Sequence, residues 1–235
     1  MRMVAGYSVF ANGGRAVVPT LIDRIQNRFG DTIFRYDDRG CEGCEATSWQ
    51  GQDEPVIIDN REQVLDPMTA YQITSMLEGV VQHGTAPAVY RTLGRPIAGK
   101  TGTTNDYHDA WFVGFSPDLA AGVYVGYDQP RSLGRANTGG HLAAPIFTEF
   151  MANALIDADP IPFRIPDGMT LIPINRRSGQ VAPEGAPDTI LEAFKPGTGP
   201  LSTTTIIGSA ETIQDSGGQN PNGKRKGFFR RLFNR

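Results

Sequence analysis

Apolar residues are unevenly distributed along the chain. They concentrate before about residue 156, and prolines interrupt the sequence repeatedly after residue 159. A segment with few apolar side chains cannot form a core of its own. The pattern therefore predicts a globular portion over residues 1–158 and a Pro/Gly/Ser/Thr-rich extension over residues 159–223. We expect that extension to be strand-like near residues 169–179 and largely disordered elsewhere.

Two helices are predicted in the first half of the globular portion. Residues 3–11 are apolar and compatible with a helix, and Asn12-Gly13-Gly14 ends it. A longer helix begins at Asp66, a good N-cap, followed by Pro67 at the first helical position, and it ends at Gly84. Its apolar residues recur at spacings of three and four, which predicts a buried stripe of Ile73, Met76, Leu77, Val80 and Val81.

Five strands are predicted from short apolar runs separated by turn signals. Residues 15–37 are typical of a hairpin that turns at Phe29-Gly30-Asp31. Three further strands cover residues 96–104, 109–115 and 119–127, and their short links favour antiparallel pairing. We expect all five strands to form one sheet.

One more helix and one weak strand complete the predicted elements. Residues 139–158 predict a helix that begins at Pro145 and buries Phe147, Phe150, Met151 and Leu155 on one face. Residues 88–93 indicate only a weak strand. The order of elements predicts an α+β fold, an antiparallel sheet flanked by helices.

Composition excludes some classes of function. The formal net charge of −3 argues against a nucleic-acid-binding protein. No run of apolar residues approaches the ~20 that a membrane-spanning helix needs. The end of the chain differs, because residues 224–235 (KRKGFFRRLFNR) combine six basic residues with aromatic ones. Such a basic amphipathic tail could lie on an anionic membrane surface, although a solvated chain end is the simpler interpretation.

The strongest chemical signal lies in GRPIAGKTGTTNDYHDAWFVGF, residues 94–115. Residues 94–101 match G-x-x-x-x-G-K-[ST], the P-loop of nucleotide-binding proteins. Residues 100–102 also spell K-T-G, a motif of enzymes that form a serine acyl intermediate. The two interpretations differ in what must follow Lys100. A P-loop requires the start of a helix there, and a K-T-G site requires an extended strand.

The residues after Lys100 favour a strand, because Thr-Gly-Thr-Thr forms a poor first helical turn. On such a strand, Gly99 and Gly102 would let a substrate backbone lie alongside. Lys100 would offer a positive charge, and the hydroxyls of Thr101 and Thr103 could bind a carboxylate. The backbone N–H of Thr103 could donate to an oxyanion. An ordinary surface lysine in a turn remains an equal alternative on these residues alone.

Longer segments extend the argument beyond this motif. They are AGYSVFANGGRAVVP (5–19), LDPMTAYQITSMLEGVVQHGTA (65–86), IAGKTGTTNDYHDAWFVGFSPDLAAGVYVGYDQPRSLG (97–134) and TGGHLAAPIF (138–147). In these segments the chain resembles the C-terminal part of the transpeptidase domain of class A penicillin-binding proteins, the bifunctional peptidoglycan synthases of the 1A type. The resemblance covers residues 4 to about 155.

The resemblance implies a fold, a reaction and a set of partners. The fold would be part of the penicillin-binding/β-lactamase-like transpeptidase fold. Lys100 would be a catalytic residue, and Thr101, Gly102 and Thr103 would bind substrate, with no metal and no cofactor. The partners would be peptidoglycan stem peptides ending in acyl-D-Ala-D-Ala, and β-lactam antibiotics. The location would be the periplasmic side of the inner membrane. Within the same block, we expect Tyr107 to border the cleft and Asp109 to hold the turn between strands.

Two motifs that this chemistry requires are missing from the sequence. The family places its nucleophilic Ser three residues before a Lys that activates it, and adds an S-x-N motif. None of the nine serines has Lys at the third following position or Asn at the second. We expect both motifs, a glycosyltransferase domain and a membrane anchor upstream of Met1, and no transpeptidase activity in this chain alone. A non-catalytic binding fragment is the alternative.

The missing part has a consequence for packing. The helix that carries the nucleophile would normally cover the sheet, so we expect exposed apolar surface and low stability in this chain.

Cys41 and Cys44 form a single C-x-x-C pair in a polar loop, residues 37–54. A zinc site needs a second pair of ligands, and the three histidines lie in separate segments. In an oxidising periplasm a local disulfide is favoured. Free thiols and a redox or metal role are the second and third alternatives.

Overall fold

The computed structural model describes residues 1–48 and 50–200. The predictions for the tail, residues 224–235, and for disorder after residue 200 lie outside the described residues. The described helices are α1 (Arg2–Ala11), α2 (Pro67–Gln82), α3 (Pro87–Leu93), the 3-10 turn η1 (Asn105–Tyr107), the π-helical turn η2 (Gly139–Ala143) and α4 (Ala144–Ala154). The strands are β1 (Arg24–Gln26), β2 (Thr32–Arg35), β3 (Cys41–Glu42), β4 (Val56–Ile57), β5 (Ala98–Thr103), β6 (Asp109–Phe115), β7 (Ala120–Gly126), β8 (Thr170–Asn175) and β9 (Thr189–Phe194).

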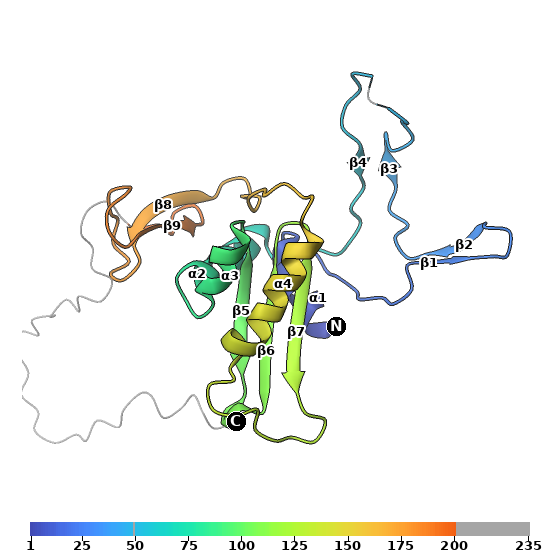
Figure 1. Cartoon of the computed structure of the whole chain (residues 1–235). Coiled ribbons are helices and arrows are strands. Elements are labelled where there is room, and N and C mark those ends of the chain that lie inside the picture. The colour runs from blue at the N-terminus through green and yellow to red at the C-terminus, as the bar shows by residue number, and fades with distance from the viewer. Residues whose placement is uncertain (49, 201–235) are drawn as a thin grey trace, which may run out of the picture. The chain divides into compact units, whose positions relative to one another are not determined.

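The main sheet is antiparallel and has three strands in the order β5-β6-β7. Helix α4 covers one face and α1 the other (Figure 1). On the α4 face, the ring of Phe112 contacts that of Phe147 with centroids 4.6 Å apart, and both side chains are fully buried. On the α1 face, Phe115 meets Phe163 at 5.5 Å, beside aromatic residues of α1. This arrangement confirms the predicted α+β fold.

Helix α2 begins where the sequence predicts. The Asp66 carboxylate accepts a hydrogen bond from the Thr69 N–H over 2.8 Å, which confirms the N-cap. The buried residues of the helix are Ala70, Thr74 and Val81, whereas Met76 is 57% exposed. The predicted buried stripe is therefore too wide, because other described residues pack against only a narrow part of the surface of this helix.

The prediction of one five-stranded sheet is wrong. Strands β1 and β2 form a separate hairpin, and β3 and β4 pair as another two-stranded sheet. Both belong to residues 15–65, which we call the arm. The chain enters and leaves the arm at one point, because the Gly14 carbonyl accepts hydrogen bonds from the N–H groups of Val64 and Leu65. Short apolar runs between turn signals predict strands, but they do not determine which strands pair.

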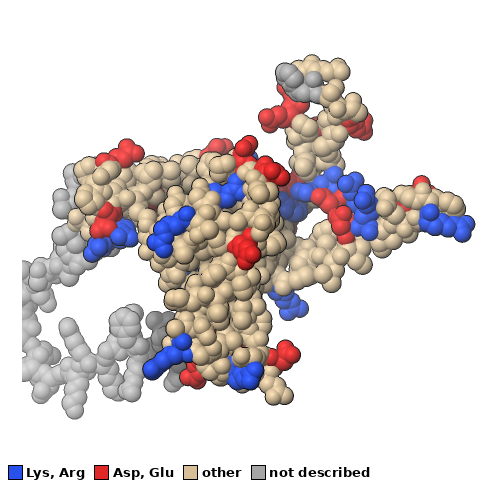
Figure 2. All heavy atoms as spheres, in the orientation of Figure 1, with Lys and Arg blue, Asp and Glu red and all other residues tan. Residues whose placement is uncertain are grey.

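Ionic and covalent links hold the arm together. The Asp59 carboxylate binds the guanidinium of Arg61 at 2.7 Å and that of Arg15 at 3.3 Å. These hydrogen-bonded arginines hold the pKa of Asp59 well below its usual range. Cys41 and Cys44 are joined in a disulfide, the favoured alternative at the sequence level. In Figure 2 acidic side chains gather on the branch of the arm that carries β3 and β4, and basic side chains lie mainly at the base of the arm and on the β1–β2 hairpin.

Two predictions near the sheet need correction. Residues 87–93 form helix α3 instead of a weak strand, with Pro87 in its first turn and Gly94 ending it at a φ of 60°. A short segment of mixed residues adopts this helix because Ala86 and Val89 bury their side chains in the α4 core. In α4, Phe147 and Met151 are buried as predicted, but Phe150 is 51% exposed.

The extension contains more structure than its composition indicates. Strand β8 lies in the segment predicted to be strand-like, and β9 pairs with it in an antiparallel hairpin. The Lys195 ammonium lies 2.9 Å from the Asp66 carboxylate and 2.6 Å from the Thr69 hydroxyl, and the Gln72 side chain donates to the Ala193 carbonyl. These contacts attach the hairpin to the first two turns of α2.

Candidate functional site

The K-T-G residues lie within strand β5, which confirms the strand interpretation. Lys100 is the third residue of the strand, and extended backbone continues to Thr103. A P-loop would require a helix to start at Lys100. The nucleotide-binding alternative is therefore wrong. Strand β5 is also an edge strand, because β6 is its single partner among the described residues.

The hydrogen-bonding phase of β5 determines which backbone groups face this free edge. The Thr104 N–H donates to the Asp109 carbonyl over 3.1 Å, just beyond the end of the ladder. Residue pairs of an antiparallel ladder alternate between hydrogen-bonded and non-hydrogen-bonded, and the β5–β6 register is continuous. Thr101 and Thr103 belong to the non-hydrogen-bonded pairs. Their N–H and C=O groups therefore point away from β6, to the free edge.

Lys100 and the two threonines lie on opposite faces of the sheet. Lys100 pairs with Val113, and Val113 pairs with Gly122 on the next strand. Directly paired residues of a sheet point to the same face, and Val4 of α1 lies against Gly122. The side chain of Lys100 therefore lies on the α1 face. Its ammonium donates to the Thr101 carbonyl over 2.7 Å, which brings the charge to the free edge. Lys100 is exposed, and it is the sole lysine among residues 1–152.

The threonine hydroxyls lie on the α4 face and contact distant segments. The Thr101 hydroxyl lies 2.8 Å from the hydroxyl of Thr85, in the connection between α2 and α3. The Thr103 hydroxyl accepts a hydrogen bond from the N–H of Gly139, at the start of η2, over 3.0 Å. The ammonium and the two hydroxyls thus approach one strand edge from its two sides. Gly102 lies between the threonines, and a Cβ added there would be only 3.1 Å from the Cβ of Trp111.

Asp109 holds the turn after β5, as predicted. The Asp109 N–H donates to the Thr104 hydroxyl over 2.8 Å, and that hydroxyl donates back to the carboxylate over 3.1 Å. The Tyr124 hydroxyl also donates to this carboxylate, which raises the pKa of Tyr124. Tyr107 has a φ of 57° in the same turn, and its carbonyl accepts from the Leu133 N–H. Its position at the border of a cleft stays a prediction.

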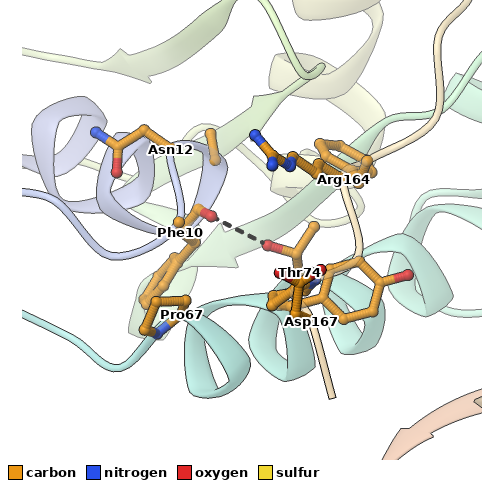
Figure 3. A pocket seen from close by; sticks show the side chains of 11 residues that line it. Phe10, Asn12, Pro67, Thr74, Arg164 and Asp167 are labelled. Carbon is orange, nitrogen blue, oxygen red and sulfur yellow. Dashed lines mark hydrogen bonds between the residues drawn. The ribbon is translucent and has the colours of Figure 1, made fainter. Parts of the chain in front are cut away.

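A separate cavity of about 410 Å³ lies between the end of α1, the start of α2 and residues 163–167. Figure 3 shows Phe10, Pro67 and Thr74 around it, with Arg164 and Asp167 at its side. The Thr74 hydroxyl is engaged with the carbonyl groups of Ala70 and Phe10. None of the K-T-G residues lines this cavity, so it does not belong to the β5 edge.

Sequence reasoning missed Thr85 and Gly139 as parts of the site. Both stand in the segments that carry the family resemblance, in HGTA (83–86) and TGGH (138–141). Their distance from Lys100 in the sequence hides the contact. A signal does exist at Gly139, where an added Cβ would overlap the backbone of Gly102 and Trp111. A glycine that sequence motifs place near a site often marks such a close approach.

Two searches of residues 1–48 and 50–200 were negative. No group of three or more His, Cys, Asp or Glu side chains there is arranged to hold a metal ion. No helix in the same residues is long and apolar enough to cross a membrane.

Comparisons with known proteins agree with the geometry. The family model described as "Penicillin binding protein transpeptidase domain" matches residues 1–152. Penicillin-binding protein 1A of Rickettsia bellii is 43% identical over 197 residues, which are 83% of this chain and 24% of that protein. Penicillin-binding protein 1A of Neisseria flavescens is 42% identical over 171 residues, which are 72% of this chain and 19% of that protein. The chain thus spans about a quarter of the length of the Rickettsia relative.

Solved structures give the same fold. The crystal structure of Penicillin-Binding Protein 1A from Haemophilus influenzae matches 86% of this chain and 32% of that chain, with a TM-score of 0.69 and 26% identity. The penicillin-binding protein PonA1 from Mycobacterium tuberculosis matches 69% of this chain and 40% of its own, with a TM-score of 0.52 and 23% identity. The first match extends beyond the residues that the family model covers.

Proposed function

This chain belongs to the penicillin-binding protein transpeptidase domain family, and from this premise we propose that β5 forms the wall of a D,D-transpeptidase cleft that binds the carboxylate end of the substrate. The substrate is a peptidoglycan stem peptide that ends in acyl-D-Ala-D-Ala, and β-lactams take its place. The observation that carries the proposal is the free edge of β5. One ammonium, two hydroxyls and two N–H groups that have no strand partner in the described part of the chain converge there within four residues.

Each group on this edge has a task in binding. The Lys100 ammonium and the hydroxyls of Thr101 and Thr103 bind the terminal carboxylate of the peptide. Hydrogen bonds from charged or hydroxyl donors to a carboxylate are stronger than neutral ones. The peptide backbone lies along the edge, where Gly102 leaves room for it. The bound peptide forms backbone hydrogen bonds with the outward-facing N–H and C=O groups of Thr101 and Thr103. It can run parallel or antiparallel to β5.

The reaction runs through a serine ester in the complete protein. The serine oxygen attacks the penultimate D-Ala carbonyl, its proton passes to the leaving amine, and the terminal D-Ala departs. The Thr103 N–H stabilises the oxyanion of each tetrahedral intermediate. The amine of a neighbouring stem then attacks the ester carbonyl, the bond to the serine oxygen breaks, and a proton of the amine returns to that oxygen as the serine is released. The two cross-linked stems are the product, on the periplasmic side of the inner membrane.

The serine of this reaction comes from outside the 235 residues, because none of them forms an S-x-x-K motif. An unactivated hydroxyl is a weak nucleophile. The chain by itself therefore binds substrate or β-lactam without forming a covalent bond. A non-catalytic binding fragment, the alternative, would also bind these ligands without forming a covalent bond. The difference is that in this alternative no second segment ever supplies a serine nucleophile.

A hybrid protein tests this proposal. Residues 1–152 replace the matching segment of Rickettsia bellii penicillin-binding protein 1A, and the product is incubated with a fluorescent penicillin. We expect a covalent band on a denaturing gel, and a loss of at least about a hundredfold in labelling rate for Lys100→Ala. Lys195→Ala in a longer hybrid serves as the matched control and should label normally. A folded hybrid that labels equally well with Lys100→Ala would refute the role of β5.

A further inference from the structure

Two hydrogen bonds connect the hydroxyl-bearing side of β5 to segments far along the chain. The Thr101 hydroxyl lies 2.8 Å from that of Thr85, and the Thr103 hydroxyl accepts from the Gly139 N–H over 3.0 Å. Thr85 precedes α3 and Gly139 begins η2, so the two contacts come from different elements. Neither residue lies on β5, and neither presents a charge to a substrate.

The balance of donors and acceptors determines what these hydroxyls can still do. A threonine hydroxyl has one proton to donate and two lone pairs that accept. The backbone N–H of Gly139 can only donate, so Thr103 is the acceptor and keeps its proton for another partner. If Thr85 donates to Thr101, the Thr101 proton is likewise available. The edge then offers two hydroxyl protons beside the Lys100 ammonium, which can only donate.

Thr85 is held in a defined position. It follows Gly84, whose N–H donates to the Val80 carbonyl over 3.1 Å, and it precedes Ala86, which is 4% exposed. A Cβ added to Gly140 would lie 3.1 Å from the Thr85 carbonyl and 3.7 Å from the Thr101 methyl group. The η2 backbone thus lies directly against both threonines. The side chain of Thr85 is exposed and reaches Thr101 from a short link between two helices.

We propose that Thr85 is a positioning residue, which together with the Gly139 amide orients the Thr101 and Thr103 hydroxyls as donors and makes this edge selective for a peptide carboxylate over a carboxamide. The inference rests on the proposed function of β5 and adds the source of its selectivity. A carboxylate only accepts hydrogen bonds, so it suits the place on this edge where the Lys100 ammonium and the two hydroxyl protons point. A carboxamide places two donor protons there, and at least one meets a donor. Donors of the site that face donor protons of the ligand cannot form hydrogen bonds, and this loss weakens the binding of the carboxamide.

Amide chemical shifts of the full 235-residue chain test this inference. The ¹⁵N-labelled protein is titrated with N-acetyl-D-alanyl-D-alanine and, separately, with its C-terminal carboxamide. We expect the acid to shift the amide signals of Thr101 and Thr103, and the carboxamide to bind roughly tenfold more weakly. In Thr85→Val, which keeps the shape and removes the hydroxyl, the acid-to-amide ratio should fall about three- to tenfold. Thr85→Ser should restore it.

The possible outcomes separate the inference from the function on which it rests. If the acid leaves the β5 signals of the unmodified chain unchanged, both are overturned. If the acid binds at β5 and Thr85→Val keeps the same acid-to-amide ratio, the inference alone is overturned. A thermal unfolding scan of each variant provides the control. A residue with a merely structural role would lower the melting temperature without moving the ratio.

Discussion

The arm, residues 15–65, and the sheet β5–β7 contain similar apolar runs but use them differently. In the sheet and its helices, Phe112, Phe115 and Phe147 are fully buried. In the arm no described residue is buried, and Phe29 and Leu21 are 74% and 88% exposed. The arm relies on ion pairs, a disulfide and local hydrogen bonds instead. Apolar content alone therefore does not reveal where a core forms; a second layer must cover it.

The difference also extends to the charges. In the arm, hydrogen bonds from Arg39 lower the pKa of Asp37 to about 2, and arginines lower that of Asp59. On α2, beside the sheet, burial raises the pKa of Glu78 to about 7. Asp37 and Asp59 of the arm thus have cationic partners, whereas Glu78 has lost water without gaining an ion pair among the described residues. The expected response to pH has opposite signs in the two regions.

The largest expected effect comes from truncating matched phenylalanines. Phe112→Ala removes a ring that contacts Phe147 in the core, and it should lower the free energy of unfolding by about 3–5 kcal/mol. Phe29→Ala in the arm should change it by less than about 0.5 kcal/mol. Urea unfolding followed by far-UV circular dichroism measures both. Equal losses would mean that the arm is as well packed as the sheet.

A pair of glycine substitutions, one beside the sheet and one in the arm, compares how closely each region is packed. Gly139→Ala forces a methyl group against the backbone of Gly102 and Trp111, which cannot move aside easily. We expect a loss of about 1–3 kcal/mol in the free energy of unfolding. Gly40→Ala in the arm meets only the end of the Ile58 side chain, at 3.5 Å, and should be neutral. A stable Gly139→Ala protein would show that η2 does not lie against β5.

The pH response separates Glu78 from the arm. Its folded pKa lies above the ordinary 4.5, so the folded state binds more protons and stability falls as the pH rises from about 4.5 to about 7. Glu78→Gln should therefore raise the melting temperature at pH 8 and leave it unchanged at pH 4. Asp59→Asn should have the reverse sign. It removes a stabilising ionised group at pH 7, and the loss should disappear as the pH falls through the lowered pKa of Asp59.

The smallest effect is expected where the extension meets α2. Lys195→Met removes the ion pair with Asp66 and the contact with Thr69. Because the Asp66 side chain is 54% exposed, the loss of stability should be smaller than any of the losses above. Hydrogen exchange of the β8 and β9 amides is a more sensitive measurement, and it should accelerate more than that of β6. Equal protection in the variant would show that other contacts hold the hairpin.

Local chemistry made part of this structure predictable. The sequence predicts β6 as residues 109–115, which are its observed bounds, because a short apolar run lies between clear turn signals. Asp66 as an N-cap and Asp109 as the holder of a turn follow from the same kind of short-range rule. The K-T-G strand could be identified because Thr and Gly after Lys100 disfavour a helix. These features depend on neighbours within about five residues.

Features that depend on long-range packing were not predictable. The separation of β1–β2 from the main sheet depends on how the arm closes at Gly14, far from either strand. The pairing of Thr85 with Thr101 joins two helices to an edge strand and leaves no local pattern. Helix α3 forms because Val89 finds a buried position, which its own sequence does not indicate. The pairing of the strands and the residues that contact the Thr101 and Thr103 hydroxyls therefore became known only with the structure.

A crystal structure of the hybrid protein acylated by a penicillin tests the central claim most directly. The account predicts that the penicillin carboxylate lies within hydrogen-bonding distance of the Lys100 ammonium and of the Thr101 and Thr103 hydroxyls. It also predicts the acyl carbonyl oxygen next to the Thr103 N–H. A carboxylate bound elsewhere, for example at Arg164 beside the cavity of Figure 3, would contradict it.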